Sequence, residues 1–282
     1  MSANKKIPCE KTIDNSLSLL FEGYSFIQNR CYKYKTDIFQ TRILGQKAIC
    51  MSGEEAAKVF YDNNYFKRKD VAPKRVQKTL TGQNGVQGLD ENAHTNRKQM
   101  FMSMMTPENI NVLIGYTTEQ WETNSAKWNN KDIVLFDEAQ LIMCQVACRW
   151  AGVPLHNNEI KQRASDLGKM IDGFSAVGFR YWQGRCARKR SEKWIRDVIT
   201  KIRSQKLSPA KGTSADTIAW HLDENKKLLS TQIAAVELIN IIRPIVAIAT
   251  YITFGVLKMY KYPKCRYKLQ IRDNAYKQMF VQ

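Results

Sequence analysis

The chain has 282 residues, of which 44% are hydrophobic, and this is enough to bury a substantial core. Its 44 Lys and Arg residues against 26 Asp and Glu residues give a formal net charge of +18, which favours anionic partners. Three histidines and seven cysteines without a CxxC pair argue against a zinc site and a disulfide framework, and they predict a reduced, cytoplasmic protein.

The first third of the chain predicts a small β element among helices. An amphipathic helix is expected over residues 16–30, started by the capping residue Asp14. Alternating hydrophobic residues around Gly45-Gln46 predict a β-hairpin over residues 39–51, and a capping pattern predicts a helix over residues 52–62. The glycine-bearing segment 82–88 predicts an irregular loop, because no Lys-Ser/Thr pair follows it at the spacing of a phosphate loop.

Helical periodicity dominates the rest of the chain. Thr106-Pro107 predicts the start of one helix, since proline is favoured in the first turn. Further helices are expected over residues 94–105, 136–150, 157–174, 188–204 and 232–257. No repeat or linker interrupts the sequence, so we expect one domain over residues 1–282, mainly α with a small β element.

The most informative feature is Arg243-Pro244, which lies within the apolar run of residues 234–251. A guanidinium stays charged at any working pH, so burying it without an anion costs several kcal/mol. The nearest acid in the run, Glu237, lies about 120° around a helix from Arg243. Pro244 removes the N–H that would bond the carbonyl of Asn240, which predicts a kink. The pattern predicts an anion site in an apolar pocket, suited to a carboxylate on a hydrocarbon tail.

Three other interpretations stay open at this point. Arg243 can be a core arginine satisfied by carbonyls or by an acid from another segment. The basic segments 185–206 and 258–277 suit a nucleic-acid-binding protein, although no RNP strand, zinc finger or KH loop accompanies them. Residues 233–257 are long enough to span a membrane, but the charged residues within them would be costly there. We therefore expect neither nucleic-acid binding nor a membrane span.

Five segments carry a resemblance to a known family. They are DNSLSLL (14–20), EAAKVFYD (55–62), PKRVQKTL (73–80), VACRWAGVPL (146–155) and AVELINIIRPIVA (235–247). Together they resemble the bacterial fatty-acid peroxygenases of the cytochrome P450 superfamily, over residues 13–282. The resemblance implies a cytochrome P450 fold, haem b as cofactor, and hydroxylation of long-chain fatty acids at the α or β carbon with hydrogen peroxide, without a redox partner.

The resemblance also assigns roles to individual residues. It implies that Arg243 holds the substrate carboxylate, that Pro244 shapes the helix beside it, and that the bound carboxylate acts as general acid–base. Gln87 matches a distal-pocket position and favours hydroxylation over decarboxylation, although a loop glutamine bonding the backbone is the alternative. His94 and Lys98, with Arg97 on the adjacent face, resemble the group that meets the haem propionates, and a solvated helix start is the alternative there.

Two departures from the family pattern limit these expectations. Thr81 stands where relatives carry an aromatic pocket residue, which affects the expected chain-length preference. No cysteine lies in the glycine-rich loop that supplies the axial thiolate, and neither Cys186 nor Cys265 has the required glycines. We therefore expect a chain that stops before the haem-thiolate loop. A catalytically inactive fragment or a haem-free fatty-acid binder is the alternative function.

Overall fold

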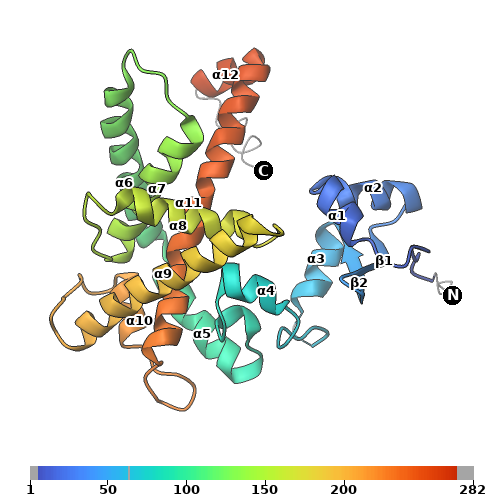
Figure 1. Cartoon of the computed structure of the whole chain (residues 1–282), viewed down its shortest axis with the longest axis horizontal. Helices are drawn as coiled ribbons and strands as arrows, with labels where there is room; N and C mark the ends of the chain where they lie inside the picture. The colour runs from blue at the N-terminus through green and yellow to red at the C-terminus, as the bar shows by residue number, and fades with distance from the viewer. Residues whose placement is uncertain (1–5, 63, 272–282) are drawn as a thin grey trace. The chain divides into compact units, whose positions relative to one another are not determined.

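The computed structural model describes residues 6–62 and 64–271, and the chain divides into two compact units, residues 1–67 and 68–282 (Figure 1). Both units are built mainly of helices, and the described residues contain a single two-stranded sheet. The predicted class, mainly α with a small β element, is confirmed.

The first unit combines short helices with the β-hairpin. Its elements are α1 (Ser16–Glu22), α2 (Ser25–Tyr34), β1 (Ile38–Ile43), β2 (Gln46–Met51) and α3 (Glu54–Tyr61). The antiparallel strands pair from Ile38 with Met51 to Ile43 with Gln46, so the hairpin is confirmed. Its turn lies at Leu44-Gly45, one residue earlier than predicted. Both turn residues have positive φ, which is typical of a tight hairpin turn.

The expected single helix over residues 16–30 is wrong, because the chain turns at Gly23 with φ +54° and forms two helices instead. Asp14 does start the first of them. One carboxylate oxygen accepts from the backbone N–H of Ser16 at 2.8 Å, and the other accepts from that of Gly45 at 2.7 Å. The same side chain thereby joins the helix start to the hairpin turn.

The second unit carries the longer helices. It begins with α4 (Lys74–Val76), a π-helical turn (Gln77–Thr81) and a 3-10 turn (Val86–Gly88). It continues with α5 (Glu91–Met104), α6 (Pro107–Ser125), a 3-10 turn (Ala126–Trp128), α7 (Leu135–Ala151), α8 (Ile160–Gly173), α9 (Phe179–Arg203), α10 (Ser214–Ala219), α11 (Thr231–Lys261) and α12 (Pro263–Gln270).

Most predicted helices of this unit are confirmed within a few residues, including the start at Thr106, whose hydroxyl accepts from the N–H of Asn109 at 3.3 Å. The short α10 and α12 were not predicted. The predicted start of α9 at residue 188 is also wrong, since the helix begins nine residues earlier at Phe179. Gly184 was thus expected outside the helix, but in the structure it lies inside α9.

Gly184 is needed because α8 and α9 approach closely at this point. A Cβ on Gly184 would lie 2.9 Å from the carbonyl oxygen of Lys169 and 3.0 Å from the Cα of Gly173. We expect Gly184→Ala to lower the free energy of unfolding by about 1–3 kcal/mol through overpacking. Gly115→Ala in α6, where a Cβ meets nothing within 4 Å, is the matched control and should raise it by up to about 1 kcal/mol. Urea unfolding of both variants measures these changes, and a change of the same sign in both variants would contradict the prediction.

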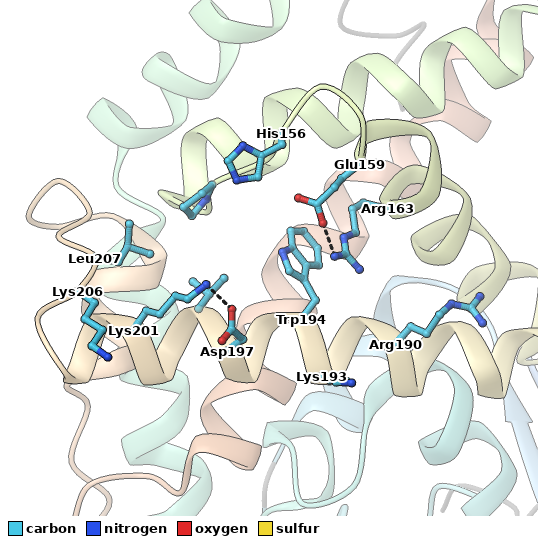
Figure 2. A pocket seen from close by; sticks show the side chains of 12 residues that line it. His156, Glu159, Arg163, Arg190, Lys193, Trp194, Asp197, Lys201, Lys206 and Leu207 are labelled. Atoms are coloured by element: carbon cyan, nitrogen blue, oxygen red, sulfur yellow. Dashed lines mark hydrogen bonds and ion pairs between the residues drawn. The ribbon is translucent and has the colours of Figure 1, made fainter.

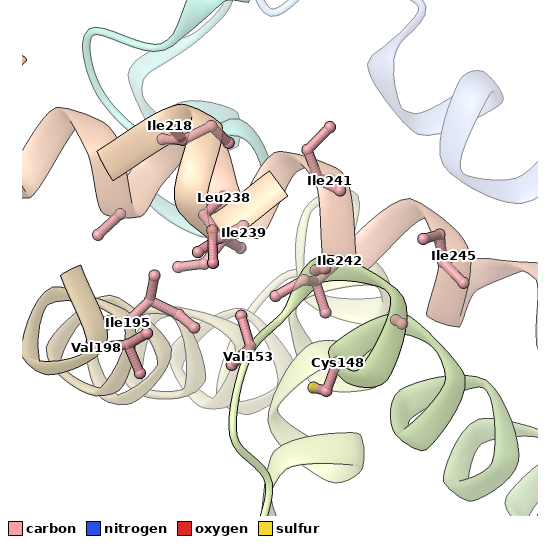
Figure 3. Close-up of a cluster of buried hydrophobic side chains, with 14 of the residues drawn as sticks. Cys148, Val153, Ile195, Val198, Ile218, Leu238, Ile239, Ile241, Ile242 and Ile245 are labelled. Atoms are coloured by element: carbon pink, nitrogen blue, oxygen red, sulfur yellow. The ribbon is translucent and has the colours of Figure 1, made fainter. Parts of the chain in front are cut away.

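The core of the second unit forms around the first half of α11. Its residues 234–242 are all buried, and the helix packs against α7, α8, α9 and α10. Figure 3 shows Leu238, Ile239 and Ile242 of α11 among side chains of the neighbouring elements, including Ile195 of α9 and Ile218 of α10. This burial is what fixes the position of the predicted site residues on α11.

Helix α11 has the length and composition of a membrane span, but 67% of its most apolar window is buried in the protein. Burial in the protein core therefore explains the apolar composition of α11, and this favours a core helix over a membrane span. The second half is different, because Tyr251, Phe254 and Tyr260 are exposed there.

Candidate functional site

Arg243 lies on α11 directly after the fully buried half of the helix, and its side chain is largely shielded from water. In the part of the chain that the structure describes it has no hydrogen bond or ion pair, and its Nε is buried without a partner. Burial lowers the pKa of Arg243 to about 10, and the positive charge of Arg188 acts in the same direction. The alternative of a core arginine satisfied by an acid or by carbonyls is thus not realised among these residues.

Asn240, one turn before Arg243, connects α11 to the glycine-bearing loop. Its amide donates to the carbonyl oxygen of Thr81 at 3.0 Å and to Oε1 of Gln87 at 3.3 Å. Gly85 lets the loop approach, since a Cβ there would lie 3.2 Å from this amide. Gln87 therefore contacts Asn240, the residue one helical turn before Arg243, and this bond is to a side chain, whereas the alternative expected a bond to the backbone.

A buried ion pair lies on the adjacent face of α11. Nη1 of Arg97, from α5, donates to Oε1 of Glu237 at 2.5 Å, and both side chains are buried. The same carboxylate oxygen accepts from the backbone N–H of Val86 at 2.8 Å, and the other accepts from Asn240 at 3.3 Å. Burial raises the pKa of Glu237, while Arg97 opposes that rise. This partner of Glu237 was not predicted, because Arg97 and Glu237 are 140 positions apart in the chain.

Arg188 of α9 is a further buried cation and was not expected as a site residue. Only 2% of it is exposed. Its Nε donates to Glu192 at 2.6 Å, and its Nη1 donates to the carbonyl oxygen of Leu80 at 2.8 Å. Burial lowers the pKa of Arg188, against the raising effects of Glu192 and then Glu237. In the sequence it belongs to the basic segment 185–206, and only the tertiary packing reveals its burial.

The charges of this region do not balance. Arg97 pairs with Glu237 and Arg188 pairs with Glu192, while Arg243 has no acid beside it. One positive charge is therefore uncompensated among these five side chains. A shielded cation without a partner is the arrangement that attracts an anion from solution.

His94 and Lys98 lie one turn apart on α5, as the sequence indicated. His94 is half-buried and Lys98 is exposed. Burial lowers the pKa of His94, and the charges of Arg68 and Lys98 act in the same direction. Arg97 between them is buried, and its Nε has no partner among the described residues. The propionate-binding role of these three residues stays a prediction.

A pocket with a volume of about 720 Å³ lies elsewhere, between the start of α8 and helix α9 (Figure 2). None of the predicted site residues lines it. Two ion pairs lie in its lining, Arg163 with Glu159 at 2.5 Å and Lys201 with Asp197 at 2.7 Å. The described residues also contain no group of three or more His, Cys, Asp and Glu that could hold a metal ion.

Comparisons with known proteins point to one group of enzymes, although no protein-family model matches the chain. The chain is 43% identical to cytochrome P450EX alpha (CYP152N1), solved with myristic acid, over 95% of its own length, with a TM-score of 0.89. A variant of cytochrome P450SP alpha (CYP152B1) matches at 40% identity over 95% of the chain and a TM-score of 0.90. A variant of cytochrome P450 OleT in complex with arachidonic acid matches at 30% identity over 94% of the chain, also with a TM-score of 0.90.

These matches cover only part of the solved structures. The chain spans 64% of P450EX alpha, 66% of the P450SP alpha variant and 64% of the OleT variant. It thus spans less than two thirds of the length of each of them.

Proposed function

The chain is a relative of the CYP152 cytochromes P450 and shares their fold over the matched length, and we propose that it provides the substrate-binding side of a haem-dependent fatty-acid peroxygenase. The observation that carries this proposal is the shielded, unpaired guanidinium of Arg243 beside the loop of Gln87. A fatty-acid carboxylate supplies the single negative charge that this cluster lacks, and buried apolar residues of α11 flank the site.

The proposed reaction is hydroxylation of a long-chain fatty acid at the α or β carbon with hydrogen peroxide. Arg243 binds the carboxylate and keeps it ionised, because an adjacent cation favours the charged form. Because the carboxylate is held in place, the α and β carbons next to it are held in place as well. The orientation of the bound fatty acid therefore selects which carbon is hydroxylated. The ionised carboxylate oxygen is then the group that accepts and returns a proton, since residues 243–246 offer no acid–threonine pair.

Haem b is the proposed cofactor, and it supplies peroxide activation and oxygen transfer when bound. The residues on α5 include the cationic and hydrogen-bond-donating side chains that the anionic propionates of haem require. Arg97 keeps one buried N–H without a partner, His94 is half-buried, and Lys98 adds an exposed cation one turn away. These three side chains would hold the anionic edge of the group.

Titration of the purified chain with myristate and with 1-tetradecanol tests the substrate part of the proposal. The two ligands have the same tail, so a preference for the acid of about 100-fold reports on the Arg243 charge. Equal affinities would contradict the proposal. Absorbance titration with haem tests the cofactor part: a saturable shift of the Soret band supports haem binding by this chain, while acid binding without haem uptake supports the haem-free binder. A thiolate-type band in the reduced carbon-monoxide difference spectrum would contradict the expectation that no cysteine of this chain ligates iron.

A further inference from the structure

Arg188 has two features that a purely structural salt bridge does not need. Its guanidinium donates hydrogen bonds to two elements. Nε donates to Glu192 of its own helix, and Nη1 donates to the carbonyl oxygen of Leu80. Glu192 in turn accepts from the amide of Gln232 on α11 at 2.9 Å. Arg188 thereby joins α9, α11 and the segment that leads into the loop of residues 82–88.

The loop lies directly against this guanidinium. Gly82 has φ +80°, and a Cβ at this position would fall 2.2 Å from Nη2 of Arg188 and 2.6 Å from a methyl carbon of Val236. Nη2 is buried and has no partner among the described residues. Only a glycine can lie this close, so the position of the loop is set by contact with the arginine.

The same loop delivers Gln87 to α11. Beyond Gly82, the backbone N–H of Val86 donates to Glu237, and Gln87 accepts from Asn240. These two bonds hold the far end of the loop, whereas Arg188 holds the near end at Leu80. Displacing the near end should therefore strain the two bonds that hold Gln87 in place on α11.

We propose that Arg188 is a positioning residue, which fixes the loop of residues 82–88 so that Gln87 stands beside the carboxylate site at Arg243. The inference rests on the proposed function for its consequence in fatty-acid binding. The placement of the loop itself does not depend on that function. Lysine cannot replace the arginine, because one ammonium lacks the fork that reaches Leu80 and Glu192 together.

The test displaces the loop from both sides in the purified chain. Arg188→Met and Arg188→Lys remove the fork, and Gly82→Ala adds a methyl group against it. Arg196→Met on the same helix is the control for loss of one exposed charge. Gly212→Ala is the control for strain, since it has φ +81° and a Cβ there meets nothing within 4 Å.

Two readouts separate this inference from the proposed function. Hydrogen exchange of the peptide containing Val86 should become about tenfold faster in all three Arg188 and Gly82 variants, since loss of a charged hydrogen bond has this effect. It should stay unchanged in both controls and in Arg243→Met. The preference for myristate over 1-tetradecanol should fall about tenfold in the same three variants.

Unchanged exchange at Val86 in folded Arg188→Met and Gly82→Ala variants would overturn the inference. Faster exchange with an unchanged ligand preference would overturn the positioning role as well. If the wild-type chain shows no preference for the acid, the proposed function fails, and the exchange data still decide whether Arg188 holds the loop. Full recovery in Arg188→Lys would show that charge alone matters, and would also contradict the inference.

Discussion

Replacing Arg243 by methionine is expected to make the protein more stable and, at the same time, to abolish its preference for fatty acids over fatty alcohols. Burial lowers the pKa of Arg243 to about 10, which means that the folded protein holds this charge at a cost. Removing an uncompensated charge should raise the free energy of unfolding by about 1–3 kcal/mol. The affinity for myristate should fall about 100-fold, because the charged hydrogen bonds to the carboxylate are lost.

Urea unfolding and myristate titration of Arg243→Met measure both effects, with Arg196→Met as the control for the loss of one positive charge from the surface. The control should leave stability and affinity close to those of the wild-type chain. The opposite signs of the two effects distinguish a binding residue from a core residue. A destabilised variant would show that Arg243 has a structural partner, and would contradict the assignment.

The pH dependence of stability follows from the same pKa. The folded protein releases the Arg243 proton more easily than the unfolded chain does. The free-energy cost of burying the charged guanidinium is therefore present below about pH 10 and is relieved as the pH rises through about 10. The stability difference between Arg243→Met and the wild-type chain should therefore shrink above this pH. A difference that stays constant from neutral to alkaline pH would contradict a shielded, charged guanidinium.

The sequence predicted those features of the fold and site that are set by neighbours along the chain. The hairpin, the helix start at Thr106 and the apolar helix with Arg243 all depend on local patterns, and the structure contains them. The break at Gly23 and the glycine inside α9 were misjudged. Glycine favours a turn by its backbone freedom, but it also serves close helix packing, and only the tertiary structure decides between the two.

The polar network around Arg243 could not be predicted from the sequence, for a different reason. Glu237 was recognised as too far around the helix to serve Arg243, but its true partner lies on α5. Arg97 was expected to contact a propionate, and one of its N–H groups instead belongs to this ion pair. Arg188 was recognised only as part of the basic segment 185–206. Pairings between segments 100 or more residues apart leave no periodic signal in one sequence.

The Arg97–Glu237 pair leads to the largest expected loss of stability. Arg97→Met leaves the carboxylate of Glu237, which is fully buried, without its counter-ion. Breaking a buried pair in this way should lower the free energy of unfolding by about 3–5 kcal/mol at neutral pH. The same change at the exposed Arg149–Glu119 pair is the matched control, and it should leave the free energy of unfolding nearly unchanged.

The double variant Arg97→Met/Glu237→Leu should recover much of this loss, because it removes the orphaned charge and not only its partner. The pH dependence has a definite sign. Burial already raises the pKa of Glu237, and loss of Arg97 removes the charge that opposes the rise. A raised carboxyl pKa costs stability as the pH rises through it, so the defect of Arg97→Met should be smaller near pH 5 than near pH 8. A defect that is independent of pH, with no recovery in the double variant, would mean that Arg97 acts by packing. The bond of Val86 to Glu237 would then hold the loop of Gln87 without help from this charge pair.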